Sequence, residues 1–330
     1  MAINFKHIPE LCILMDRMED LLISENRSEY PEVNEIADYI LKNNGKRLRP
    51  LLLLTFAQML GFQDNHLHLA CAVEQIHTAT LIHDDVIDAS DLRRGRASVN
   101  SAYGVPTSIL FGDYLYTKAF KLLIKYGNNL ITNELLKTVS LMSEGEIKQM
   151  MESHDPDLTE ENYFHVIRGK TSELFSLACK MAALLNFELE DKRTKSCEDF
   201  GFHLGNAFQI TDDVMDYEAT STSMGKSPGD DFAEGKITLP MIHLLKHACA
   251  PDREKVLQLL QLKTPDNSEK RKQAFPEILQ LLKKYKSFDY CRSLADQEIE
   301  LAQKSLKTFE DCVYTRLLSD ILEHLVNRHT

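Results

Sequence analysis

The chain has 330 residues and a mass of 37.8 kDa, and at 43% apolar and 27% charged it is long enough to bury a sizeable core. Its 50 acidic residues against 38 basic ones give a net charge of −12, which disfavours nucleic-acid binding and means that an anionic ligand needs local basic clusters or a metal. With 13 Gly, 10 Pro and no Trp, the chain has few residues that interrupt helices.

Helical periodicity runs through most of the chain, as in Leu51–Leu60 and Leu135–Met150. We expect around ten or more helices of roughly 12 to 25 residues and predict an all-α fold. No linker or shift in composition divides the chain, so a single domain over residues 1–330 is expected. The candidate connections between helices are 43–45, 61–65, 91–106, 153–157, 219–235 and 265–267.

We expect no signal peptide at the N-terminus, because His7, Pro9 and Glu10 interrupt the apolar run that one requires. No stretch approaches the ~18 apolar residues of a membrane span. The seven cysteines are widely spaced and form no Cys-x-x-Cys pair, which indicates reduced thiols. We expect a soluble cytoplasmic protein that touches a membrane at most peripherally, during product release.

Two basic clusters stand out in this acidic chain, Gly45–Pro50 (GKRLRP) and Arg93–Arg96 (RRGR). Arg offers planar bidentate donors and Lys a compact charge, and both bind phosphate oxygens. Either cluster alone would more often pair with nearby acids or lie in a solvated loop. Beside an acidic motif that binds metal, a diphosphate site is the more economical interpretation.

Leu81–Asp88 (LIHDDVID) is the first of two acidic motifs. In a helix, Asp84 and Asp88 lie one turn apart and Asp85 is rotated by ~100° from Asp84, so three carboxylates share one arc. Like charges this close, among apolar neighbours, require a positive partner. Mg²⁺ fits, because it takes one or two carboxylates and keeps its other positions for water or phosphate oxygens.

The same spacing returns 128 residues later in Gln209–Asp216 (QITDDVMD). One such motif is explained equally well by a solvated acidic helix face or by an acidic first turn. Two copies with the same spacing in similar apolar surroundings favour one chemical device used twice. Neither has the ligand pattern of an EF-hand. The acids of the second motif are Asp212, Asp213 and Asp216.

The loop Met224–Pro240 carries Lys226 and Lys236 between glycines, and it is either a lid that brings lysines to a phosphate or an inert turn. It matches neither a P-loop nor a dinucleotide-binding motif. No nucleophilic triad and no His-Glu-x-x-His are present. His77 lies seven residues before Asp84 on nearly the same helix face, where a ligand and a structural histidine are equally consistent with the spacing.

In their order and spacing, these segments resemble the trans-isoprenyl diphosphate synthases, above all the long-chain polyprenyl (octaprenyl-type) branch. The resemblance covers nearly the whole chain. The segments that carry it are Gly45–Pro50, Ile76–Asp88, Arg93–Gly95, Gly112–Asp113, Gly145–Gln149, Gly169–Thr171, Phe208–Asp216 and Lys226–Pro240.

The resemblance implies a single polyprenyl synthase domain, in which antiparallel helices surround a deep cavity and the two acidic motifs face each other at its mouth. It also implies a homodimer. The reaction would be the Mg²⁺-dependent head-to-tail condensation of isopentenyl diphosphate onto an allylic diphosphate such as farnesyl diphosphate, with up to three Mg²⁺ ions per active site. The product would be an all-trans chain of about C35 to C50, of the kind used for quinone side chains.

The resemblance also assigns roles to residues. The proposed Mg²⁺ ligands are Asp84, Asp88 and Asp212. The supporting acids are Asp85, Asp213 and Asp216, and the six acids share the catalytic role with Lys170 and Lys226. The residues that would bind the allylic diphosphate are Arg93, Lys170, Thr171, Gln209, Lys226 and Lys236. Those that would bind isopentenyl diphosphate are Lys46, Arg49, His77 and Arg94.

Product length should depend on what blocks the cavity below Asp84. Thr80 and Ala79 lie about 6 to 7.5 Å deeper along the helix, and Ile76 lies a further turn down. Short-chain relatives tend to carry aromatic residues at the first two positions, so the small residues here favour a long product. The alternatives are that Ala79 only packs against a neighbouring helix, that the product is shorter (farnesyl or geranylgeranyl), or that the chain is a non-catalytic subunit of a heteromeric synthase.

Overall fold

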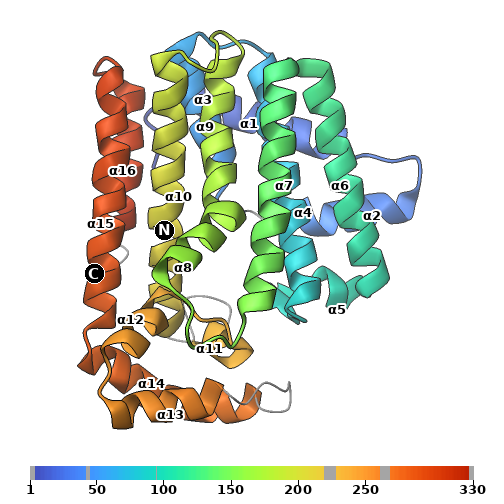
Figure 1. The fold of residues 1–330 in the computed structure, drawn as a ribbon. Coiled ribbons are helices and arrows are strands. Elements are labelled where there is room, and N and C mark those ends of the chain that lie inside the picture. The colour runs from blue at the N-terminus through green and yellow to red at the C-terminus, as the bar shows by residue number, and fades with distance from the viewer. Residues whose placement is uncertain (1–3, 42–44, 94, 219–227, 261–267, 327–330) are drawn as a thin grey trace.

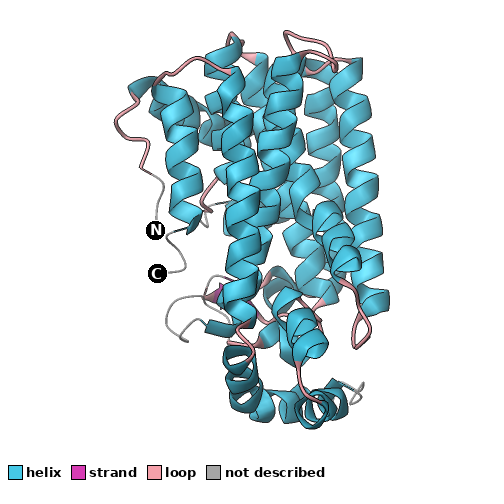
Figure 2. Ribbon diagram, turned by 60° about the vertical axis from the view of Figure 1, so that its left-hand side comes forward, coloured by secondary structure: helices cyan, strands magenta, loops and turns pink. Residues whose placement is uncertain are grey.

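The computed structural model describes residues 4–41, 45–93, 95–218, 228–260 and 268–326, and nearly all of their regular structure is helical (Figures 1 and 2). The predicted all-α fold is confirmed. The strands in these ranges are β1 (Leu92–Arg93) and β2 (Arg96–Ala97), an antiparallel pair in which Arg93 lies opposite Arg96. The segment 91–106, expected to be a connection, therefore contains this hairpin and a short helix.

The first part of the chain supplies most of the long helices. The helical elements of this part are, in chain order, α1 (Pro9–Glu25), α2 (Pro31–Leu41), α3 (Leu48–Leu60), α4 (Asn65–Ile87), α5 (Val99–Tyr103), α6 (Val105–Tyr126), α7 (Asn129–Glu152), α8 (Glu160–Ile167), the π-helical turn η1 (Arg168–Ser172), α9 (Glu173–Leu184) and α10 (Lys192–Glu218).

The C-terminal part closes one end and one side of the bundle (Figure 1). Its helices are α11 (Asp230–Glu234), α12 (Leu239–His247), α13 (Ala250–Leu260), α14 (Ser268–Lys284), α15 (Ser287–Ser305), the 3₁₀ turn η3 (Leu306–Thr308) and α16 (Val313–Val326). Helix α11 lies within 219–235, where a loop alone was expected.

Local sequence signals begin several of these helices. The side chains of Asn128 and Thr159 accept hydrogen bonds from the backbone N–H groups of Ile131 and Asn162, which caps α7 and α8. Proline in the first turn begins α1, α6 and α12, where its missing N–H is not needed.

The described residues form two apolar cores, which follow one another along the length of the bundle. In the larger one, Phe56 of α3 packs edge-on against Phe200 of α10, with ring centroids 5.3 Å apart. In the smaller one, Tyr217 at the end of α10 packs against Phe288 of α15, and Phe232 of α11 is fully buried. Helix α10 therefore passes from one core into the other.

Helices α4 and α10 run along the bundle and end toward the same end of it, beside α11 (Figure 1). Helix α4 packs chiefly against α6, and α10 packs chiefly against α9 and α15. This arrangement brings the ends that carry the acidic motifs toward one region. No helix in the described ranges has both the length and the apolar character needed to cross a bilayer.

Candidate active site

The first acidic motif lies at the C-terminal end of α4, and an arginine of the following β-hairpin forms an ion pair with one of its acids. Arg93 of β1 contacts Asp85, with Nη2 at 2.6 Å from Oδ1 and Nε at 2.7 Å from both carboxylate oxygens. Asp85 is buried, and the ion pair with Arg93 compensates its charge within the protein. Burial raises the pKa of Asp84 to about 6, against the opposing charge of Lys170.

Lys170 lies in the π-helical turn η1, which packs closely against α7. A Cβ at Gly169 would lie 2.5 Å from the Leu141 carbonyl oxygen, so only glycine allows this approach. The Lys170 Nζ donates to Glu146 Oε2 and to Gln149 Oε1, both at 2.9 Å. Against the effect of burial, Asp84 and Glu146 raise the pKa of Lys170, so its positive charge is retained at the first motif.

A chain of hydrogen bonds connects η1 to the second motif on α10. Thr171 donates to Gln209 Oε1 at 2.6 Å, and the Gln209 amide donates to Asp213 Oδ1 at 2.8 Å. The Tyr163 hydroxyl donates to Asp213 Oδ2 at 2.6 Å. Burial nevertheless raises the pKa of Asp213 to about 8. Asp212, the residue that precedes Asp213, is exposed.

Asp216 is a buried acid with an incomplete set of partners. Burial and the nearby Asp231 and Asp230 raise its pKa to about 9. Its Oδ2 atom has no hydrogen-bond partner among the described residues. A buried carboxylate oxygen without a donor requires a proton or an additional cation.

Lys236 connects the C-terminal part of the site to α4. Its Nζ lies 2.8 Å from Asp88 Oδ1 and 2.8 Å from Glu234 Oε2. Against the effect of burial, Asp88, Glu234 and Asp231 raise the pKa of Lys236. Asp231 is also a principal neighbouring charge of Asp213 and Asp216. The two motifs therefore share one electrostatic environment.

The residues present fit a divalent cation that arrives with an anionic ligand. No group of three His, Cys, Asp or Glu side chains in the described part of the chain forms a ready-made metal site. Mg²⁺ does not need one, because it is usually held by one or two carboxylates together with substrate phosphates. The raised pKa values of Asp84, Asp213 and Asp216 and the unpartnered Asp216 oxygen indicate that the acids lack sufficient positive charge.

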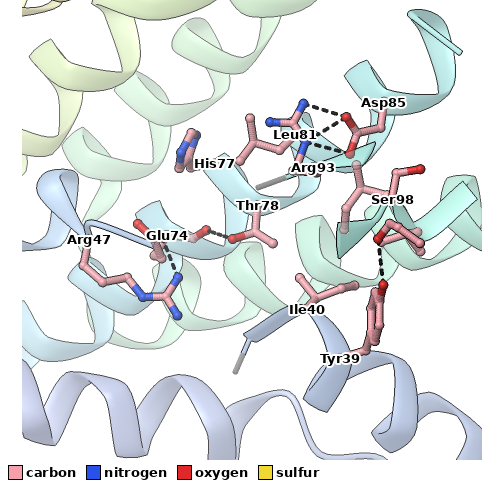
Figure 3. Close-up of a pocket in the computed structure, with 13 residues that line it drawn as sticks. Tyr39, Ile40, Arg47, Glu74, His77, Thr78, Leu81, Asp85, Arg93 and Ser98 are labelled. Atoms are coloured by element: carbon pink, nitrogen blue, oxygen red, sulfur yellow. Dashed lines mark hydrogen bonds and ion pairs between the residues drawn. The ribbon is translucent and has the colours of Figure 1, made fainter. Parts of the chain in front are cut away.

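A pocket borders the first motif, between α2, α4 and the hairpin (Figure 3). His77, Thr78 and Leu81 of α4 line it, and Arg47 and Glu74 form an ion pair at one side (Figure 3). His77 therefore faces a cavity.

The other basic residues expected at a second diphosphate lie in different surroundings. The Arg49 guanidinium lies over the Phe175 ring, 4.0 Å from its centroid, and burial lowers its pKa to about 10. Its Nε atom is buried without a hydrogen-bond partner in the described ranges. Lys46 is exposed. Arg94 and Lys226 lie outside the described residues.

Several residues at the site had no role assigned to them from the sequence. Glu146 and Gln149 belong to the segment Gly145–Gln149, which carries part of the resemblance, and they hold Lys170 from one face of α7. Tyr163 and Asp231 come from distant segments and gave no such signal. Tyr116 of α6 lies near Asp84, and burial together with that charge raises its pKa to about 12.

The residues expected to control product length lie along α4 below Asp84. Ala79 and Ile76 are fully buried, and Thr80 is half-buried with its hydroxyl donating to the His77 carbonyl oxygen. On α6, Tyr116 and Phe120 lie one turn apart with ring centroids separated by 6.0 Å. Tyr116 is thus an aromatic side chain beside the first motif.

Comparisons with known proteins agree with these features. Residues 30–279 match the family model described as polyprenyl synthetase. The chain is 35% identical to the octaprenyl diphosphate synthase of Haemophilus influenzae over 316 residues, or 96% of this chain and 94% of that protein.

Solved structures agree as well. A polyprenyl synthase from Caulobacter crescentus, crystallised with calcium and isoprenyl diphosphate, is 30% identical with a TM-score of 0.89, covering 98% of this chain and 97% of that chain. A decaprenyl diphosphate synthase from Rhodobacter capsulatus is 34% identical with a TM-score of 0.87, covering 97% of each chain.

Proposed function

Since the chain belongs to the polyprenyl synthetase family, we propose that its two acidic motifs hold the diphosphate of an allylic substrate while isopentenyl diphosphate is joined to it. The protein is a prenyltransferase, a trans-polyprenyl diphosphate synthase of the long-chain type. The observation that carries the assignment of the site is the convergence of charge. Lys170 lies beside Asp84, and Lys236 is paired with Asp88, although both lysines come from distant parts of the chain.

Ionisation of the allylic substrate is the first step of the proposed reaction. The carbon–oxygen bond breaks only if the growing negative charge on the diphosphate is stabilised. Lys170 and Lys236 would give up part of their contacts with Glu146 and Glu234 and donate to the diphosphate oxygens instead. Asp84, Asp88 and Asp212 would hold Mg²⁺, which would act as a Lewis acid and supply the remaining positive charge.

Bond formation then depends on where the second substrate lies. We assign the diphosphate of isopentenyl diphosphate to Lys46, Arg49, His77 and Arg94, of which His77 lines the pocket. Its double bond would attack the allylic cation, forming the new carbon–carbon bond, and a proton would pass to the departing diphosphate. Proximity of the two bound substrates replaces a protein nucleophile.

The remaining residues of the site orient these groups. Thr171 and Gln209 form a hydrogen-bonded pair that also holds Asp213, and both would present their polar atoms to the allylic diphosphate. Arg93 is held by Asp85, so its guanidinium is fixed at the edge of the first motif. Lys226 is assigned to the same diphosphate from the family motif.

The partner proposed for this chain is a second copy of itself. Helices α6 and α7 lie side by side on one side of the bundle (Figure 1). They expose large apolar side chains, with exposed fractions of 74% for Ile124, 68% for Leu110 and 82% for Met151. Exposed large apolar side chains gathered on two neighbouring helices are typical of an interface between subunits. Replacing Leu110 and Ile124 together with glutamate should convert dimers into monomers in sedimentation velocity, and an unchanged mass would contradict this assignment.

The function is tested by incubating the protein with farnesyl diphosphate, radiolabelled isopentenyl diphosphate and Mg²⁺. We expect a ladder of extended prenyl diphosphates that is lost when EDTA removes the metal. A cyclic hydrocarbon would identify a terpene cyclase instead. No conversion by the folded protein would favour a non-catalytic subunit.

A further inference from the structure

Arg47, the basic residue between Lys46 and Arg49, occupies a closed network of its own. Its side chain is only 9% exposed. Its Nε and Nη2 atoms donate to Glu19 Oε1 and Oε2 at 2.6 and 3.3 Å, Nη1 donates to Glu74 Oε1 at 2.8 Å, and Nη2 also donates to the Leu41 carbonyl oxygen at 3.0 Å. One guanidinium thus joins α1, α4 and the end of α2.

The backbone at Arg47 is held in an unfavourable conformation. Its φ is 47°, in the left-handed region that residues other than glycine rarely adopt, and it immediately precedes α3. The hydrogen bonds of the guanidinium offset this cost. The direction in which the chain leaves Lys46 and enters α3 therefore depends on the side-chain network of Arg47.

Glu74 lies between two cationic groups. It accepts a hydrogen bond from Arg47. Burial lowers the pKa of Arg49, and the negative charge of Glu74 opposes this decrease. Burial raises the pKa of Glu74, and the charges of Arg47 and Arg49 counteract this. One turn further along α4, Thr78 donates to the Glu74 carbonyl oxygen, and His77 lines the same pocket (Figure 3).

We propose that Arg47, Glu19 and Glu74 form a clamp that positions Lys46 and Arg49 for the diphosphate of isopentenyl diphosphate. The proposal rests on the proposed function. The clamp residues are positioning residues, because the donors of Arg47 are directed to Glu19, Glu74 and Leu41 and the two carboxylates repel an anionic substrate. Their contribution to binding passes through the backbone at Arg47 and the charge of Arg49.

The sign of the effect of removing an acid distinguishes the clamp from simple electrostatics. In Glu74→Gln and Glu19→Gln, a negative charge near an anionic substrate is lost, which by direct electrostatics would lower the KM for isopentenyl diphosphate. The clamp predicts the opposite. We expect this KM to rise about fivefold or more, with the KM for farnesyl diphosphate within about twofold of the wild-type value.

Asp64→Asn is the matched control. Asp64 precedes α4 and pairs with Arg17 of α1 at 3.0 Å, so this variant also breaks an ion pair between these two segments, but at an exposed site. It should leave both KM values unchanged. Arg47→Lys keeps the positive charge and loses the planar fork, and it should show the same selective rise in the KM for isopentenyl diphosphate.

Folding is checked by circular dichroism. Glu19 is 36% exposed, and its replacement leaves the Arg47–Glu74 pair in place, so Glu19→Gln carries the test if Glu74→Gln does not fold. A lower or unchanged KM for isopentenyl diphosphate in the folded variants, or an equal rise for both substrates, overturns the clamp. Failure of the wild-type protein to extend a prenyl chain would instead overturn the proposed function.

Discussion

The six acids of the two motifs differ in how far the protein itself compensates them. Asp85 is paired with Arg93, and Asp88 with Lys236. Asp84 has Lys170 as its main opposing charge and keeps a pKa of about 6 because it is largely buried. These differences indicate which carboxylates are held by side chains and which are directed to a ligand. The spacing in the sequence predicted all six acids but not their partners, which depend on segments up to 148 residues away.

Asp84→Asn and Asp212→Asn should each lower turnover by at least ~10²-fold, as expected when a preorganised charge partner of the transition state is lost. The fold should remain intact, because each change preserves side-chain shape. Steady-state rates with farnesyl and isopentenyl diphosphate provide the measurement. Asp157→Asn, at a side chain that is 84% exposed, is the control and should retain full activity. A rate close to that of the wild type in either motif variant would remove that residue from the mechanism.

His66, near the start of α4, should make stability depend on pH. Its Nδ1 accepts from the Gln63 backbone N–H at 2.9 Å, and its Nε2 lies 3.0 Å from the Ala182 carbonyl oxygen, so the neutral ring satisfies both contacts. Burial lowers the pKa of His66 below the ordinary histidine value of about 6.5. As the pH falls below that value, the unfolded chain takes up a proton that the folded one does not, so the free energy of unfolding decreases.

This loss of stability is absent above the pKa of His66 in the unfolded chain, and it grows as the pH falls toward the pKa in the folded protein. It is measured by comparing urea denaturation of the wild type with that of His66→Gln. The stability advantage of the wild type should shrink between about pH 7.5 and pH 5. An advantage that stays constant over this range would show that His66 titrates equally in both states.

At the level of elements, the sequence located both acidic helices because periodicity and spacing are local properties. It did not predict that β1 and β2 turn Arg93 back onto Asp85, because two-residue strands carry no periodic signal. It also did not predict the π-helical turn that presents Lys170 and Thr171. That turn depends on tertiary packing, since it lies between α7 and α10 at glycine contacts.

Gly205→Ala tests whether this packing sets the diphosphate site. A Cβ at Gly205 of α10 would lie 2.6 Å from the Ser172 Cα, so the turn must move away from α10. We expect a loss of about 1–3 kcal/mol in the free energy of unfolding. The KM for the allylic diphosphate should rise, because Thr171 and Gln209 would separate. Lys195→Ala, at an exposed position of the same helix, is the control and should change neither the stability nor this KM. An unaltered KM in folded Gly205→Ala would show that the position of the turn does not determine binding of the allylic diphosphate.

At the level of the whole molecule, the bundle must accommodate the growing chain along its axis. Helix α4 descends from Asp84 past Thr80 and Ala79 to Ile76, and α6 provides Tyr116 beside the acidic motif. The sequence identified the small residues on α4 from helical rise alone. It gave no indication of Tyr116, because pairing of α4 with α6 is a property of the tertiary structure.

If the chain passes along α4, Thr80→Phe together with Ala79→Phe should shorten the product by several isoprene units, as measured by mass spectrometry of the extended prenyl diphosphates. Ala79 is fully buried, and an added ring there costs about 1–3 kcal/mol through overpacking, so the double variant must be shown to fold. Thr80 is half-buried, and Thr80→Phe alone carries the test if the double variant is unstable. Ala250→Phe, at an exposed site that begins α13, controls for the added ring. Products of wild-type length from folded Thr80→Phe would place the path of the chain elsewhere, and the small residues of α4 would then serve helix packing alone.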